Sequence, residues 1–123
     1  MMGGATANPF PSKEGLLIVE RYDTAFLYLY PQVQNFARSH GRFRDAMLDV
    51  MLRVPGEIYL AAKVGQVSKL NTLDATLAEL RWCLRFASNP KVKLITTHQQ
   101  GHAESLLAEV GGMVNAWKAK LKK

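Results

Sequence analysis

The side chains that could do chemistry are few, and they form no recognisable catalytic or metal-binding pattern. His98 and His102 stand four residues apart, a spacing that would place two imidazoles on one face of a helix, where they could share a metal ion. A third ligand at close spacing is missing. Cys83, the only cysteine, is interpreted as a small packing residue rather than a nucleophile. We therefore predict a protein that is not an enzyme and holds no metal or other cofactor.

Charge is the more informative property of this chain. Sixteen Lys and Arg stand against ten Asp and Glu, for a net charge of +6. Residues 1–60 carry equal numbers of both signs, so the whole excess lies in residues 61–123. An excess localised in this way favours polyanionic partners, which include RNA, DNA and the acidic surface of another protein.

Aromatic residues accompany part of this charge. At ~100° per residue in a helix, Trp82 and Phe86 point away from the leucine stripe of their segment, and Arg81 and Arg85 share a flank. Exposed aromatics beside arginine are typical of interfaces. We favour a subunit interface at Trp82 and Phe86. The alternatives are a stacking surface for unpaired bases and partial burial beneath residues 1–12.

Four segments with helical periodicity position these side chains. They span residues 13–39, 42–64, 70–87 and 97–121, and apolar residues recur in each at spacings of mostly three and four. Short connections between such segments favour antiparallel neighbours. The sequence therefore predicts an all-α, up-down-up-down four-helix bundle over residues 13–123. The predicted core positions are Val19, Tyr22, Phe26, Leu29, Val33 and Phe36; Phe43, Met47, Val50, Val54, Ile58 and Ala61; Leu70, Leu73, Leu77, Leu80, Leu84 and Ala87; Ala103, Leu107, Val110, Val114, Trp117 and Leu121.

Proline and glycine mark where the first two helices should bend or end. Pro31 should bend the first helix, and Gly41 is a natural stop for it. Pro55, followed by Gly56, falls in the middle of the second segment. Either one helix kinks there, or a new helix starts with Pro55 in its first turn. We favour the kink, because the apolar stripe continues in register across it. Gly65 should end this segment.

Other residues predict where the third helix ends and where the fourth begins. Asn89 precedes Pro90, which should end the third helix. Thr97 and Gln100 fit a capping box at the start of the fourth.

The alternating helix directions gather basic residues at both ends of the bundle. One end carries Arg38, Arg42, Arg44, Arg85, Lys91 and Lys93, and the other carries Lys63 and Lys69 with the C-terminal lysines.

The N-terminal residues 1–12 are predicted to be a flexible arm, because they are rich in Gly and Pro and have no apolar run. They lack the positive n-region of a secretory signal. No stretch of ~20 apolar residues suggests a membrane span. A single cysteine is compatible with a reducing compartment. We therefore expect a cytoplasmic protein that does not enter the membrane.

Several uncommon strings carry a resemblance to a known family. Residues 17–22 (LIVERY), 28–31 (YLYP), 66–70 (QVSKL) and 80–86 (LRWCLRF), with His98-Gln99 and residues 107–111 (LAEVG) ahead of Trp117, occur in the order found in that family. The chain resembles, from Leu16 to Leu121, the accessory variability determinants of diversity-generating retroelements. These are related to the four-helix-bundle proteins encoded in ribosomal-RNA intervening sequences. Pro55-Gly56 and Thr97, where proline is expected, depart from the family pattern.

The resemblance implies a basic, barrel-shaped homopentamer of four-helix bundles. It also implies binding to nucleic acid and to the reverse transcriptase of the element, in support of the mutagenic cDNA synthesis that leads to retrohoming. The family's basic positions fall on Arg21, Lys69, Arg81 and Arg85 in this chain. The charge pattern adds Lys63, Lys91 and Lys93 as candidate contacts to nucleic acid or a partner. The alternative hypothesis is a protein–protein interaction module with no nucleic-acid role.

Overall fold

The computed structural model describes residues 13–122. Four helices follow one another along this part of the chain: α1 (Lys13–Gln34), α2 (Gly41–Val64), α3 (Val67–Ala87) and α4 (Thr97–Leu121). A short 3₁₀ helix, η2 (Arg38–His40), precedes α2. Residues 13–122 contain no strand. The predicted all-α four-helix bundle is confirmed.

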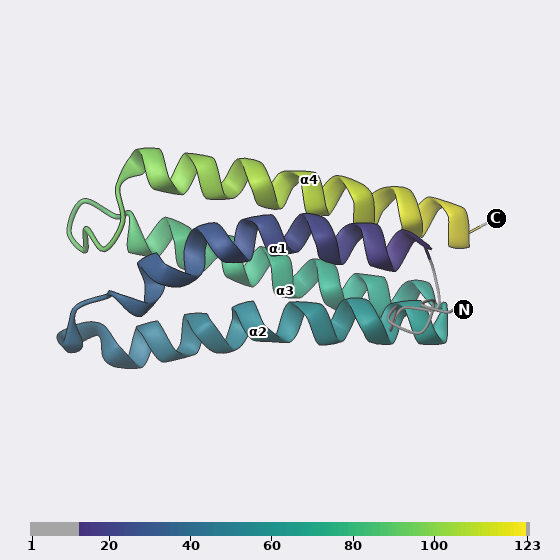
Figure 1. The fold of residues 1–123 in the computed structure, drawn as a ribbon, viewed down its shortest axis with the longest axis horizontal. Helices are drawn as coiled ribbons and strands as arrows, with labels where there is room; N and C mark the ends of the chain where they lie inside the picture. The colour runs from purple at the N-terminus through teal and green to yellow at the C-terminus, as the bar shows by residue number, and fades with distance from the viewer. Residues whose placement is uncertain (1–12, 123) are drawn as a thin grey trace, which may run out of the picture.

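The helices run up, down, up and down (Figure 1). Each helix packs against its neighbours in sequence, and α4 closes the bundle by packing against α1. The η2 segment and the loop between α3 and α4 lie together at one end, which we call the η2 end. The tight turn between α2 and α3 lies at the other end, with the start of α1 and the end of α4. No helix within residues 13–122 combines the length and the apolar character needed to cross a membrane.

The leucine, valine and alanine stripes predicted for α2, α3 and α4 form most of the core, which gains Ile95 from the loop that follows α3. Two predicted positions at the edges, Phe43 and Leu121, are only half-buried. In α1 the buried face is rotated slightly from the predicted one. Ile18 and Ala25 are fully buried there, whereas Val19 and Phe26 are half-buried at the edge.

The first helix ends earlier than predicted. It continues through Pro31 but stops at Gln34, one turn later. The Asn35 amide is shared between the carbonyls of Pro31 and Gln32, at 3.3 and 3.2 Å, and the chain then leaves the helix. This turn carries Phe36 into the core, where it is 5% exposed. The helix therefore ends five residues before the predicted end at Ser39.

Gly41 is not a helix stop, which corrects the prediction. Its backbone is right-handed helical, with φ −60° and ψ −37°, and it is the first residue of α2. Gly65 does end α2 as predicted. It adopts the left-handed conformation with φ 71°, and its amide donates to the Ala61 carbonyl at 2.8 Å. Glycine suits this position because it has no Cβ to clash there.

Helix α2 runs as one helix across Pro55, so the alternative in which a new helix starts there is wrong. A proline in a helix has no amide to donate to the carbonyl four residues earlier, which here belongs to Met51. The phenol of Tyr22 donates to this carbonyl at 2.7 Å in the buried interior. A side chain of α1 thus replaces the backbone hydrogen bond that Pro55 removes.

The last two helices differ from the prediction by small shifts. Helix α3 begins at Val67, three residues before the predicted start. The capping box of α4 is formed by Thr96 and Gln99, one residue before the predicted pair. The Gln99 amide donates to Thr96 Oγ1 at 3.0 Å, and Gln99 Oε1 accepts from the Thr96 amide at 2.9 Å. Gln100 is engaged elsewhere, because its Oε1 accepts from Ser88 Oγ at 2.6 Å.

Candidate nucleic-acid and partner interface

The most conspicuous exposed aromatic is Trp82, on the outer side of α3, with 52% of its surface exposed. Its indole stacks on the ring of Phe86, with centroids 5.5 Å apart and planes at 11°. Phe86 in turn packs on Phe43 of α2 at 4.8 Å, and Phe43 stacks on Phe36 at 6.1 Å. A row of four rings therefore runs from the core to the surface.

This row corrects one part of the sequence analysis. Trp82 is exposed as predicted, but Phe86 is half-buried between the indole and Phe43. The geometry of α3 by itself does not show the ring of Phe43, which α2 packs against Phe86. The alternative cover for these aromatics, residues 1–12, lies outside the described residues.

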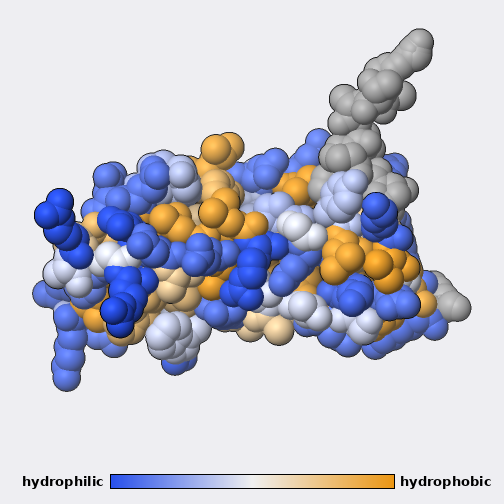
Figure 2. Space-filling view, turned by 90° about the horizontal axis from the view of Figure 1, so that it is seen from below, coloured by the Kyte–Doolittle hydropathy of each residue, from blue (hydrophilic) through white to orange (hydrophobic). Residues whose placement is uncertain are grey.

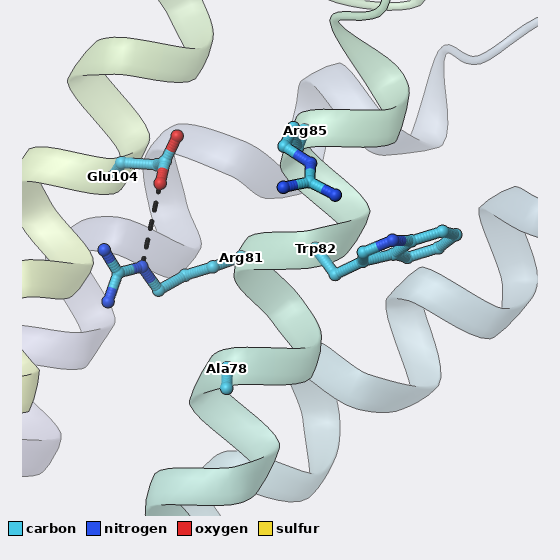
Figure 3. Close-up of a pocket in the computed structure, with 5 residues that line it drawn as sticks. All are labelled: Ala78, Arg81, Trp82, Arg85 and Glu104. Carbon is cyan, nitrogen blue, oxygen red and sulfur yellow. Dashed lines mark ion pairs between the residues drawn. The ribbon is translucent and has the colours of Figure 1, made fainter.

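An open groove between α3 and α4 lies beside Trp82. It is lined by Ala78, Arg81, Trp82, Arg85 and Glu104 (Figure 3). Arg81 extends toward α4 and pairs with Glu104 at 3.7 Å, whereas the indole of Trp82 points away from this pair. Arg85 lies one turn further along α3 and forms no ion pair within residues 13–122. Both arginines are exposed.

The acidic residue of the groove is held by a small network. Glu104 Oε2 accepts from Gln100 Nε2 at 2.8 Å, and Gln100 Oε1 accepts from the Ser88 hydroxyl. The carboxylate is therefore fixed by α4 and partly neutralises Arg81. No feature of the sequence near Arg81 indicates Glu104, which is 23 residues away, so sequence reasoning missed it.

Arg21 is also neutralised by a residue that the sequence analysis did not identify. It lies on α1 and pairs with Glu109 of α4 at 2.6 Å. Because α4 packs between α1 and α3, Arg21 and Arg81 lie on different flanks of α4. Each side chain of these pairs is between about a third and a half exposed, so water screens them and their contribution to stability is small.

The remaining predicted contacts divide between the two ends of the bundle. Lys63 and Lys69 lie close to the turn between α2 and α3, and Lys69 is half-buried. Lys91 and Lys93 lie in the loop before α4, at the η2 end, and both are exposed. The structure brings Arg81 and Arg85 together with Trp82, but it does not gather all seven basic residues into one site.

Nothing within residues 13–122 forms a group of three metal-ligating side chains. His102 packs its ring against Tyr28 at 4.5 Å, in an edge-on arrangement. Cys83 is buried, and burial, with a further contribution from Glu79, raises the pKa of its thiol. A thiol with a raised pKa is a poorer nucleophile at neutral pH.

Comparison with known proteins identifies the family of this chain. No curated protein matches the chain. The model of the bAvd-like family matches residues 16–121, which include nearly all of the four helices. The chain therefore belongs to the bAvd-like family, the accessory variability determinants of diversity-generating retroelements.

Proposed function

We propose that this protein is a non-catalytic, basic, oligomeric accessory subunit of a diversity-generating retroelement. It binds the template RNA or its cDNA together with the reverse transcriptase of the element, and so supports mutagenic reverse transcription. The observation that carries this proposal is the family match over residues 16–121, which takes in the whole α3–α4 groove. The positive excess in the second half of the chain is in keeping with a polyanionic partner.

Self-association through the outer side of α3 is part of the proposal. An indole with half of its surface in water, stacked on a second ring, has the size and rigidity of an interface anchor. We assign Trp82 and Phe86 to a contact between copies. The homopentamer implied by the resemblance would repeat the basic groups of each chain around a ring, which strengthens the attraction for a polyanion.

The groove next to Trp82 is assigned to nucleic acid or the polymerase. Arg81 and Arg85 lie on the same side of α3 and project into the open groove (Figure 3). Lys69, Arg21, Lys63, Lys91 and Lys93 are proposed as further contacts. Since these positions are spread over both ends and two flanks, they fit contact with an extended partner or with more than one partner.

The test measures both associations in one set of variants. Arg81→Ala with Arg85→Ala should weaken binding to single-stranded RNA or capture of the reverse transcriptase, while far-ultraviolet circular dichroism stays unchanged. Lys13→Ala with Lys122→Ala, which removes the same charge from exposed positions at the opposite end, is the matched control. Unchanged association in the first double variant would contradict both assignments. Wild-type protein that captures the polymerase but shows little RNA binding and a shallow salt dependence would instead support a protein–protein module.

A further inference from the structure

The cations of this protein differ in whether a carboxylate already neutralises them. Six form ion pairs within residues 13–122, and they include the predicted contacts Arg21 and Arg81. The others in these pairs are Arg44, Arg53, Lys118 and Lys120. A paired cation must give up its carboxylate, or share it, before it can serve a phosphate. The unpaired cations are therefore the better candidates for contact with a polyanion.

Five exposed cations at the η2 end of the bundle form no ion pair within residues 13–122. They come from three segments that the fold brings together: the 3₁₀ helix with the first turn of α2, the last turn of α3, and the loop before α4. They are Arg38, Arg42, Arg85, Lys91 and Lys93. Strongly hydrophilic side chains gather at this end, on the left of the space-filling view (Figure 2).

Acidic residues do little to offset these charges. The carboxylates in the second turns of α2 and α4, Asp45 and Glu104, are already paired with Arg44 and Arg81. Neither α2 nor α4 has an acidic residue in its first turn, although both helices begin at this end. The opposite end differs, because Glu14 and Asp74 pair there with Lys120 and Lys118.

Two of the five cations are held on an ordered loop. The Asn89 side chain accepts from the Lys91 amide at 2.8 Å, and the Asn89 carbonyl accepts from the Lys93 amide at 2.8 Å. The Ala87 carbonyl then accepts from Leu94 and Ile95 at 2.8 and 3.1 Å, and Ile95 is buried. A loop fixed in this way loses little conformational freedom when its lysines bind a ligand.

Within residues 13–122, the η2 end carries none of the strongly exposed large apolar side chains. The strongly exposed large apolar side chains within residues 13–122 all belong to α1, α2 or α3: Leu17, Leu27, Leu52, Tyr59, Leu60, Val64 and Trp82. None belongs to η2, to the first turns of α2 and α4, or to the loop before α4. Protein interfaces depend on buried aromatic and aliphatic anchors, whereas a phosphate backbone is bound chiefly by charge.

We propose that the η2 end is the surface that binds the phosphate backbone of RNA or single-stranded cDNA, through Arg38, Arg42, Arg85, Lys91 and Lys93. This inference rests on the nucleic-acid binding proposed above and assigns it to one end of the bundle. The helix flanks, with their exposed apolar side chains, remain for contacts with proteins. Arg21 and Arg81, each held by a glutamate, contribute less to the phosphate contact than the five unpaired cations.

The experiment compares two double variants that remove the same charge from opposite ends. Lys91→Gln with Lys93→Asn removes two cations at the η2 end, and asparagine tolerates the positive φ of 56° at position 93. Lys13→Gln with Lys122→Gln is the matched control. The probe is an unstructured single-stranded RNA of about 20 nucleotides, and its affinity is measured by fluorescence anisotropy at several salt concentrations.

The η2-end variant should bind RNA about 10- to 30-fold more weakly at ~0.1 M salt. The reason is that the logarithm of the binding constant falls linearly with the logarithm of the salt concentration, and each phosphate contact on a single strand adds about 0.7 to the slope of this line. The slope of this variant should fall by about 1.4, and the control should match the wild type within about twofold. Equal losses in both variants, or no loss in either while the wild type binds RNA, would overturn the assignment of the end and leave the proposed function intact. Loss of polymerase capture alone would assign this end to a protein instead. Wild-type protein that fails to bind RNA would contradict the nucleic-acid role itself.

Discussion

The phenol of Tyr22 donates a 2.7 Å hydrogen bond to the Met51 carbonyl, which is the acceptor that Pro55 leaves without an amide donor in α2. Both Tyr22 and Met51 are almost completely buried. An unsatisfied carbonyl in this position would carry the full cost of its lost hydration. The hydrogen bond between α1 and α2 thus allows a proline inside a core helix, and it connects the two elements that carry the N-terminal half of the bundle.

This relationship predicts coupling between Tyr22 and Pro55. Tyr22→Phe should lower the free energy of unfolding by about 1–3 kcal/mol, because it leaves the Met51 carbonyl without a donor. Pro55→Ala restores the backbone amide, so the same Tyr22→Phe change should cost at least about 1 kcal/mol less in that background. Urea unfolding of the four proteins in the cycle measures both quantities. Equal costs of Tyr22→Phe in the two backgrounds would show that the two groups are independent.

Alkaline pH should destabilise the protein partly through the same tyrosine. Burial raises the pKa of the Tyr22 phenol above its ordinary value of 10.0. The unfolded chain then loses this proton at a lower pH than the folded protein does. The stabilisation is fully present below about pH 10 and is lost as pH rises toward the folded pKa. Urea midpoints at pH 8, 10 and 11 should therefore fall more steeply for the wild type than for Tyr22→Phe. Parallel curves for the two proteins would contradict this linkage.

The register of the α4 capping box gives a simple comparison of neighbouring threonines. Thr96→Ala removes the oxygen that accepts from the Gln99 amide and should cost about 1 kcal/mol. Thr97→Ala changes an exposed residue inside the first turn and should cost less than about 0.5 kcal/mol. Thermal unfolding of both variants distinguishes the two registers, and a larger loss for Thr97→Ala would favour the one that begins a residue later.

The sequence predicted the helices well because their apolar spacing is regular. In α3 the predicted residues from Leu70 to Ala87 are all buried. In α1 the spacing allowed two adjacent stripes, since Val19 and Phe26 are apolar as well as Ile18 and Ala25. Only the packing of α2 and α4 on this helix decides between them. Periodicity therefore predicts that a helix has a buried face, but it locates that face only within one residue position when its neighbours are also apolar.

Helix ends were predicted less well, since they depend on contacts that periodicity does not show. Glycine is compatible with both the end and the start of a helix, and Gly41 begins α2 because α1 has already ended at Gln34. The predicted capping box pairs Thr97 with Gln100, whereas the structure forms the capping box with Thr96 and Gln99. Pairing of Gln100 with Ser88 uses the side chain that the predicted box would need.

The candidate site was predictable in its residue types but not in its electrostatics. Helical geometry placed Trp82 on the outer side of α3 and Arg81 with Arg85 on its flank, and all three line one groove. The effective charge of Arg81 depends on Glu104, and that of Arg21 depends on Glu109, 88 residues away. Pairs at such separations are set by how α4 packs between α1 and α3. These ion pairs therefore could not be predicted from the sequence without the fold.

In the row of four rings, we expect substitution of Trp82 and of Phe86, the two rings on α3, to have different effects on self-association and stability. Trp82→Ala should abolish self-association with a loss of stability below about 1 kcal/mol, because half of the indole is already in water. Phe86→Ala should cost about 2 kcal/mol, since the ring packs between Phe43 and the indole. Light scattering gives the native mass and urea unfolding the stability. Leu60→Ala, at a 45% exposed position of α2, is the control. Retention of the native mass by Trp82→Ala would move the subunit contact to another face.

Neutralising the carboxylate of the groove should strengthen RNA binding. In Glu104→Gln the new side chain can still accept from Gln100, so the local network is kept while Arg81 is released from its ion pair. One repulsive charge fewer beside Arg85 should raise RNA affinity about threefold at ~0.05 M salt, and the gain should vanish near 1 M because exposed charges are then screened.

Glu109→Gln releases Arg21 on the other flank of α4 and should raise the affinity less, since it lies further from the η2 end. Both variants are measured by fluorescence anisotropy on one RNA. An equal gain from Glu109→Gln would show that the total charge of the protein governs binding, whereas a loss from Glu104→Gln would show that the nucleic acid needs Arg81 held in its paired position.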